Sequence, residues 1–205
     1  SLVAHEYFHL WNVKRIRPIE LGPFNYDQEN YTSLLWVMEG FTSYYDELIL
    51  MRSGFISEQE YLQKFNSTLN YLESTEGRKV QPVAHASFDA WIKGYRPNEN
   101  SSNTTMSYYT NGHVLAALLD VKTISKYNGE KCLDDFMRLL YKKFYVKEKR
   151  GFTEKEFEET LSNFMKEDMS SFINDHVFDT KIPDYKSIFE AIGVKVDITL
   201  NKKNL

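Results

Sequence analysis

The chain has 205 residues, enough for one ordinary domain with a sizeable apolar core. A net charge of −4 at pH 7, without a long basic stripe, argues against a nucleic-acid-binding protein. The single cysteine, Cys132, excludes an intrachain disulfide framework, and no apolar run approaches the roughly 20 residues that cross a bilayer.

The first half of the chain reads as helices separated by polar loops. After a loop with Gly and Pro over residues 20–30, apolar positions at helical spacing predict a helix over residues 33–51. Ser57 and Glu60 form a capping-box pattern, which predicts a further helix that runs to about residue 71. The Gly, Pro and Asn residues between positions 77 and 107 indicate a long loop.

The second half continues as helices. Thr153 and Glu156 repeat the capping-box pattern at the start of one of them. Helices are predicted over residues 111–127, 130–145, 154–165, 171–177 and 184–192. Residues 194–200, VKVDITL, are the one stretch that alternates like a strand. We therefore predict a mainly α fold without internal repeats.

The sequence HEYFH near the start of the chain carries a metal-binding pattern. His5 and His9 are four positions apart, so on a helix both imidazoles can reach one zinc ion at about 2.0–2.1 Å. Glu6 projects beside the metal, where it can take a proton from an activated water and hand it to a leaving amine. This is the H-E-x-x-H arrangement of metalloproteases, but the pattern also arises by chance, so a third ligand has to support it.

Glu39 is the best candidate for the third ligand. Other acids follow the motif along the chain, but Glu39 is the only charge in the apolar stretch LLWVMEGFTSYY. A carboxylate in apolar surroundings must be paired or bound to a metal, because an isolated buried charge costs several kcal/mol or more. The alternative is an ion pair of Glu39 with Arg15 or Arg17. Gly40, which is costly inside a helix, indicates close approach of this helix to the first one.

Three separated blocks together resemble the catalytic region of the glycyl aminopeptidase family. They are HEYFHLWNVKRIRP at residues 5–18, ENYTSLLWVMEGFTSYYDEL at residues 29–48 and MSYYTNGHVLAALLDV at residues 106–121. Members of this family are gluzincins, zinc peptidases related to aminopeptidase N and more distantly to thermolysin. The resemblance implies one zinc ion per chain with His5, His9 and Glu39 as its ligands, and Glu6 as general base and acid.

The same resemblance implies a role for Tyr109. In the related aminopeptidases a tyrosine three residues before a glycine, at the head of a helix, donates a hydrogen bond to the oxyanion. Tyr109 has this position before Gly112, and Tyr108 is the alternative. A phenol with an ordinary pKa near 10 stays protonated at pH 7 and can donate to a developing negative charge.

The resemblance also implies how the chain is organised. Residues 1–193 would be the helical lobe of a thermolysin-like (gluzincin) catalytic domain, and residues 194–205 would be a tail at the start of a PDZ-like domain. Because the chain starts inside the metal helix, we expect a fragment that lacks the preceding β-sheet lobe. Its substrates would be peptides with a small N-terminal residue, Gly or Ala, and its activity without the missing parts would be weak or absent.

Several other residues have more open roles. Asp46 lies seven positions after Glu39 on the same helical face, so it either accepts the second N–H of a ligating histidine or faces solvent. Lys14, Arg15 and Arg17 would form structural ion pairs, or meet a substrate carboxylate or an acidic partner. The histidines without ligand spacing are His85, His113 and His176.

Two other functions remain open at the level of the sequence. The first is a helical binding module with a vestigial metal site and no catalysis. The second is a zinc hydrolase with another substrate, because H-E-x-x-H does not fix the substrate.

Overall fold

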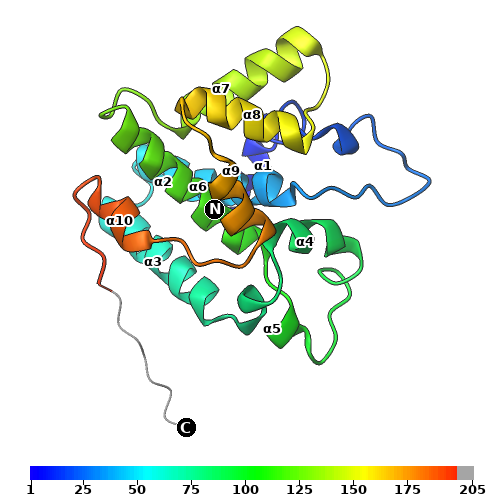
Figure 1. Cartoon of the computed structure of the whole chain (residues 1–205), viewed down its shortest axis with the longest axis horizontal. Helices are drawn as coiled ribbons and strands as arrows, with labels where there is room; N and C mark the ends of the chain where they lie inside the picture. The colour runs from blue at the N-terminus through cyan, green and yellow to red at the C-terminus, as the bar shows by residue number, and fades with distance from the viewer. Residues whose placement is uncertain (198–205) are drawn as a thin grey trace.

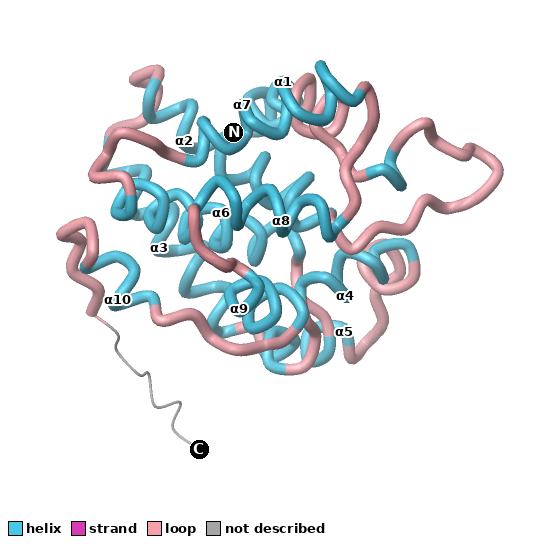
Figure 2. The backbone as a smooth tube through the Cα atoms, turned by 45° about the horizontal axis from the view of Figure 1, so that its top comes forward, coloured by secondary structure: helices cyan, strands magenta, loops and turns pink. Residues whose placement is uncertain are grey.

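The computed structural model describes residues 1–197, and these contain helices and loops but no strand (Figure 2). The prediction of a mainly α fold is therefore confirmed for the described part of the chain. Its α-helices are α1 Leu2–Phe8, α2 Phe41–Arg52, α3 Glu58–Ser74, α4 Val83–Phe88, α5 Ser101–Thr104, α6 Tyr108–Lys126, α7 Leu133–Leu140, α8 Glu154–Met165, α9 Ser170–Ile173 and α10 Tyr185–Glu190. None of the described helices is long and apolar enough to cross a bilayer.

Helix α6 is the central element of the fold (Figure 1). Every residue from 111 to 121 is buried, so this helix is enclosed rather than amphipathic. It packs against α2, α3, α4 and α10, and against a π-helical turn, Trp36–Gly40, that leads directly into α2. The predicted helix over residues 33–51 is thus a π turn followed by an α-helix.

Two glycines allow α6 and the π turn to cross at backbone contact. A Cβ atom on Gly40 would lie 2.3 Å from the Cα atom of Gly112, and one on Gly112 would lie 2.2 Å from the carbonyl oxygen of Trp36. No side chain fits at either place. The expectation that Gly40 admits the first helix is therefore wrong, because the close neighbour of Gly40 is α6.

Both predicted capping boxes are present. The Ser57 side chain accepts from the N–H of Glu60 at the start of α3, and Thr153 accepts from Glu156 at the start of α8. Helix α6 begins three residues before its predicted start, because Ser107 caps it through the N–H of Thr110. This extension places Tyr109 in the first turn of the helix.

The predicted loop between residues 77 and 107 is wrong in part. It contains α4 and α5, together with the short 3₁₀ turns Glu76–Lys79 and Asp89–Trp91. These elements are too short to show a helical period in the sequence. Of the predicted strand over residues 194–200, the first four residues have no regular structure and the rest lie outside the described residues.

Candidate metal centre

Helix α1 presents both histidines of the H-E-x-x-H motif on one face. His9 is the C-cap of the helix and keeps α-helical backbone angles, and its N–H donates to the carbonyl of His5 at 3.2 Å. The two imidazole rings consequently lie edge to face with their centroids 4.7 Å apart. The helix therefore brings the two imidazole rings close together, as the spacing of four residues predicts.

Glu39 meets both histidines from the π turn. Its Oε2 atom lies 3.2 Å from Nε2 of His5 and 3.3 Å from Nε2 of His9. Within the described residues, Glu39 forms ion pairs with His5 and His9 and with no other residue. The alternative pairing of Glu39 with Arg15 or Arg17 is therefore not found there. His5, His9 and Glu39 form the one group of potential metal ligands in residues 1–197, with all three ligand atoms within 4.8 Å of one another.

The outer nitrogen of each ring is already occupied. Nδ1 of His5 lies 3.1 Å from Oδ2 of Asp46, and Nδ1 of His9 lies 2.8 Å from the carbonyl oxygen of Asn12. Since a carbonyl can only accept, Nδ1 of His9 carries a hydrogen, so the neutral ring has its lone pair on Nε2, on the side of Glu39. Asp46 fixes His5 in the same way, which is the usual support of a metal-bound histidine. Asp46 is buried, so the solvent-facing alternative does not hold.

This arrangement fits a tetrahedral divalent cation. Two imidazole lone pairs and one carboxylate oxygen converge on one point, which is unfavourable unless positive charge lies between them. Ligands held 2.0–2.1 Å from a tetrahedral centre lie roughly 3.3–3.4 Å from one another. The Nε2 to Oε2 distances of 3.2 and 3.3 Å match two edges of such a tetrahedron.

The charges at the cluster support each other. Burial favours the neutral form of Glu39. When a proton on Nε2 of His9 and of His5 takes the place of a metal ion, the hydrogen bonds and charges of these rings outweigh burial and lower the pKa of Glu39. Burial alone would lower the pKa of His9, but its hydrogen bonds to Glu39 and to the carbonyl of Asn12 raise it. Glu39 is therefore ionised at neutral pH, as a metal-ligating carboxylate must be.

Asn12 is a residue of the centre that the sequence analysis did not identify. It is fully buried, and its side-chain amide donates to the carbonyls of Val37 and Met38 at 2.9 and 3.0 Å and to the hydroxyl of Thr42 at 3.1 Å. Because its own carbonyl holds His9, Asn12 connects the end of α1 to the π turn that carries Glu39. No pattern of neighbouring residues marks it, since its partners lie 25 to 30 positions away.

Tyr109 lies beside the cluster and Tyr108 lies behind it. The Tyr109 ring is 6.2 Å from the His5 ring, centroid to centroid, and the Tyr108 ring stacks on Tyr109 at 4.8 Å. Burial and the charge of Glu39 raise the pKa of Tyr109, so its hydroxyl keeps its proton at neutral pH. Glu6 lies on α1 between the histidines and is exposed, and its charge contributes to the raised pKa of His9.

The remaining candidates lie apart from the cluster. Arg15 donates to the carbonyl of Leu10 and lies over the ring of Tyr145, and neither Arg15 nor Arg17 has an ion pair within residues 1–197. The predicted structural ion pairs of these arginines are therefore not found in that range. The other histidines do not join the group of metal ligands: His85 is exposed, His113 is buried in the core, and His176 bonds to the carbonyl of Lys181.

Comparison with known proteins agrees with this geometry. The profile of the M61 glycyl aminopeptidase family matches residues 1–115. The crystal structure of an aminopeptidase N family protein from Idiomarina loihiensis is similar, with a TM-score of 0.87 and 33% sequence identity over 92% of this chain. The chain spans 32% of the length of that protein, and a search of curated proteins found no match. Since the family profile covers more than half of the sequence, including both histidines and Glu39, the chain belongs to the M61 glycyl aminopeptidase family.

Proposed function

We propose that this chain is the metal-bearing helical part of a zinc-dependent aminopeptidase. In this proposal residues 1–193 are the helical lobe of the catalytic domain, residues 194–205 lead towards a PDZ-like domain, and a β-sheet lobe completes the site. The substrates are peptides with Gly or Ala at the N-terminus, a preference that rests on the family. One observation carries the proposal: Nε2 of His5 and of His9 and Oε2 of Glu39 converge while both Nδ1 atoms are held by acceptors.

The donor set favours zinc among the common divalent metals. Two imidazole nitrogens and one carboxylate oxygen are a usual ligand set of catalytic zinc, which keeps a further position open. Magnesium and calcium prefer sites made of oxygen ligands only. A zinc ion held by His5, His9 and Glu39 would supply a Lewis acid for the activation of water and for the scissile carbonyl.

The side chains of the chain supply the proton transfers and the hydrogen bond to the oxyanion. Glu6 takes a proton from the attacking water and returns it to the departing amine. Tyr109 donates its hydroxyl hydrogen to the oxygen of the tetrahedral intermediate, which its raised pKa allows at neutral pH. Asp46 and Asn12 hold the rings of His5 and His9 with Nε2 towards Glu39.

The first test measures zinc binding with a matched pair of variants. The side chains of Glu39 and Glu47 have similar exposure, 20% and 16%, but only Glu39 contacts the histidines. We expect one zinc ion per chain by metal analysis in the wild type and in Glu47→Gln, and loss of that ion in Glu39→Gln. Equal zinc content in Glu39→Gln would refute the proposed ligand set.

The second test measures hydrolysis of Gly- and Ala-anilides. In the full-length parent, Glu6→Gln should keep its zinc and lose hydrolysis by about 10²–10⁴-fold, the usual effect of removing a general base. The isolated chain should bind zinc but hydrolyse these substrates slowly or not at all. A zinc-loaded parent without any hydrolysis would instead support a binding module, and hydrolysis of other substrates alone would support a different zinc hydrolase.

A further inference from the structure

A pocket of about 450 Å³ lies between the segment that follows α1 and the end of the π-helical segment Tyr141–Glu148. Most of its lining is cationic, and it consists of Arg15, Arg17, Tyr145, Val146, Lys149 and Arg150. A backbone bridge holds the two sides together. The N–H of Phe152 donates to the carbonyl of Arg17 at 3.0 Å, and the N–H of Ile19 donates to the carbonyl of Phe152 at 2.9 Å. Two basic stretches that are far apart in the sequence therefore lie side by side.

Three of the four cations in this pocket have no counter-charge. Arg150 is paired with Glu156, whose carboxylate accepts from both of its terminal nitrogens at 2.6 and 2.8 Å. Within the described part of the chain, Arg15, Arg17 and Lys149 form no ion pair, and Arg15 and Arg17 are half-buried. Withdrawing a charge from water without a partner is unfavourable. The pocket therefore has an excess of positive charge that an anion would offset.

Both unpaired arginines are held in place by contacts other than ion pairs. The guanidinium of Arg15 donates to the carbonyl of Leu10 and lies 5.9 Å from the centroid of the Tyr145 ring. The guanidinium of Arg17 lies against Gly22, where a Cβ atom would be 2.2 Å from its central carbon. A guanidinium can offer two parallel N–H donors to one oxyanion. Because these two groups are already positioned, an anion would bind them with a smaller cost of ordering side chains.

Charge and shape indicate which kind of anion fits. A phosphate monoester carries about 1.5–2 negative charges at pH 7 and three acceptor oxygens, whereas a carboxylate carries one charge, so three unpaired cations suit the phosphate better. The carboxylates of Glu148 and Glu156 lie on the Arg150 side, where a nucleic acid or a long acidic polypeptide would meet them. The volume lies within the range of about 300–1,000 Å³ typical of small-molecule sites. A small phosphate-bearing group therefore fits this pocket best.

We propose that this pocket binds a phosphate group, carried either by a small soluble molecule or by a lipid headgroup. None of its lining residues is a ligand of the metal centre or takes part in the proposed hydrolysis. The inference is therefore tested by binding alone, whether or not the protein hydrolyses peptides.

The test titrates inorganic phosphate into the zinc-loaded full-length parent by calorimetry. Arg17→Gln and Lys149→Gln should each weaken binding about tenfold or more, because each removes a charged partner of the anion. Both variants should fold as the wild type does, since neither side chain has a hydrogen-bond partner within the described residues. Arg96→Gln removes the same charge from an exposed arginine outside the pocket, so it is the control and should keep the affinity. Phosphate that binds at the zinc ion would not respond to Arg17→Gln.

Vesicles distinguish the two sources of the phosphate group. Binding to vesicles of phosphatidic acid but not of phosphatidylcholine, lost in Arg17→Gln, would assign a lipid headgroup. Binding of inorganic phosphate without vesicle binding would assign a soluble phosphate compound. The absence of both kinds of binding, an affinity for phosphate that is equal in Arg17→Gln and the wild type, or acetate binding as tightly as phosphate would each overturn the inference.

Discussion

Replacement of Asn12 by Ala tests whether a buried amide holds the two halves of the metal centre together. The side-chain nitrogen of Asn12 donates to the carbonyls of Val37 and Met38 and to the hydroxyl of Thr42. Its loss removes these buried hydrogen bonds, although the carbonyl of Met38 keeps the hydroxyl of Thr42 at 2.6 Å, and should cost about 1–3 kcal/mol of unfolding free energy. The backbone carbonyl that holds His9 remains, but it is no longer fixed relative to Glu39. Loss of such support for a metal ligand lowers metal affinity by about 10–100-fold.

The assay separates the effect on the centre from the effect on the fold. The free energy of unfolding of the zinc-free chain is measured in denaturant, and zinc affinity by competition with a chelator. Gln81→Ala is the control, because Gln81 is also buried and its amide oxygen accepts from the N–H of Met106 at 3.0 Å, away from the cluster. We expect both variants to lose stability but only Asn12→Ala to lose zinc affinity. Equal zinc affinity in the two variants would refute the reasoning.

Three further outcomes follow from contacts described above. Gly112→Ala places a Cβ 2.2 Å from the carbonyl oxygen of Trp36, a backbone atom that cannot move easily, so the substitution should lower the free energy of unfolding by about 1–3 kcal/mol or more. A melting temperature equal to that of the wild type would contradict the close crossing of α6 and the π turn. Burial lowers the pKa of His113 to about 4 in the folded chain, whereas the same histidine has a pKa near 6.5 in the unfolded chain. As the pH falls, the unfolded state therefore binds a proton at His113 before the folded state does. Stability should therefore fall by up to about 3 kcal/mol as the pH drops from about 6.5 to 4, and His113→Leu should flatten that part of the denaturation profile if the assignment is right. In the full-length parent, Tyr109→Phe should reduce kcat by about 10²–10³-fold with zinc content unchanged, as loss of an oxyanion donor does, whereas an unaltered kcat would exclude this role.

The predictions that succeeded from sequence rest on local rules. The capping boxes at Ser57 and Thr153 need only residues three positions apart, and both are formed. The spacing of His5 and His9 is a property of one helix. Glu39 stood out because a lone charge in an apolar stretch needs a partner, and it has the two histidines.

The features that the sequence analysis got wrong or did not identify depend on which elements meet in space. The cost of Gly40 indicated a close approach, but only the fold shows that Gly112 of α6 is its neighbour. Asn12 looks like an ordinary polar residue at the end of a helix, since its partners lie 25 to 30 positions away. The pocket that Arg17 and Lys149 share joins two basic stretches that are far apart in the sequence, so neither stretch predicts it alone.

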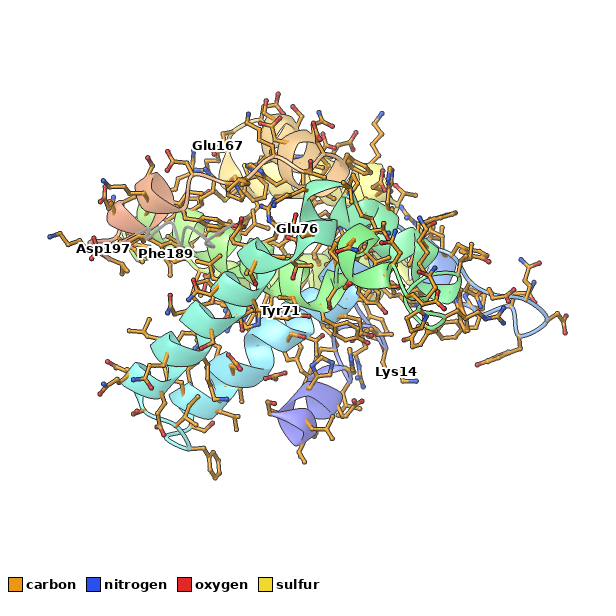
Figure 3. The ribbon with its side chains drawn as sticks, turned by 90° about the horizontal axis from the view of Figure 1, so that it is seen from below. Lys14, Tyr71, Glu76, Glu167, Phe189 and Asp197 are labelled. Carbon is orange, nitrogen blue, oxygen red and sulfur yellow. The ribbon has the colours of Figure 1, made fainter. Side chains whose placement is uncertain are left out.

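Helix α1 carries both histidines of the motif but has no buried residue of its own. It lies beside α2 (Figure 3), and His5 contacts both Asp46 and Glu39 on the helical body. Phe8 stacks on Tyr45 at 4.6 Å and Asn12 holds the end of the helix, but His5 and His9 attach it through the same atoms that would coordinate the ion. Loading of the ion should therefore strengthen the docking of α1. A chelator should make this N-terminal segment the first to be cut in limited proteolysis, before the helices around α6 are attacked.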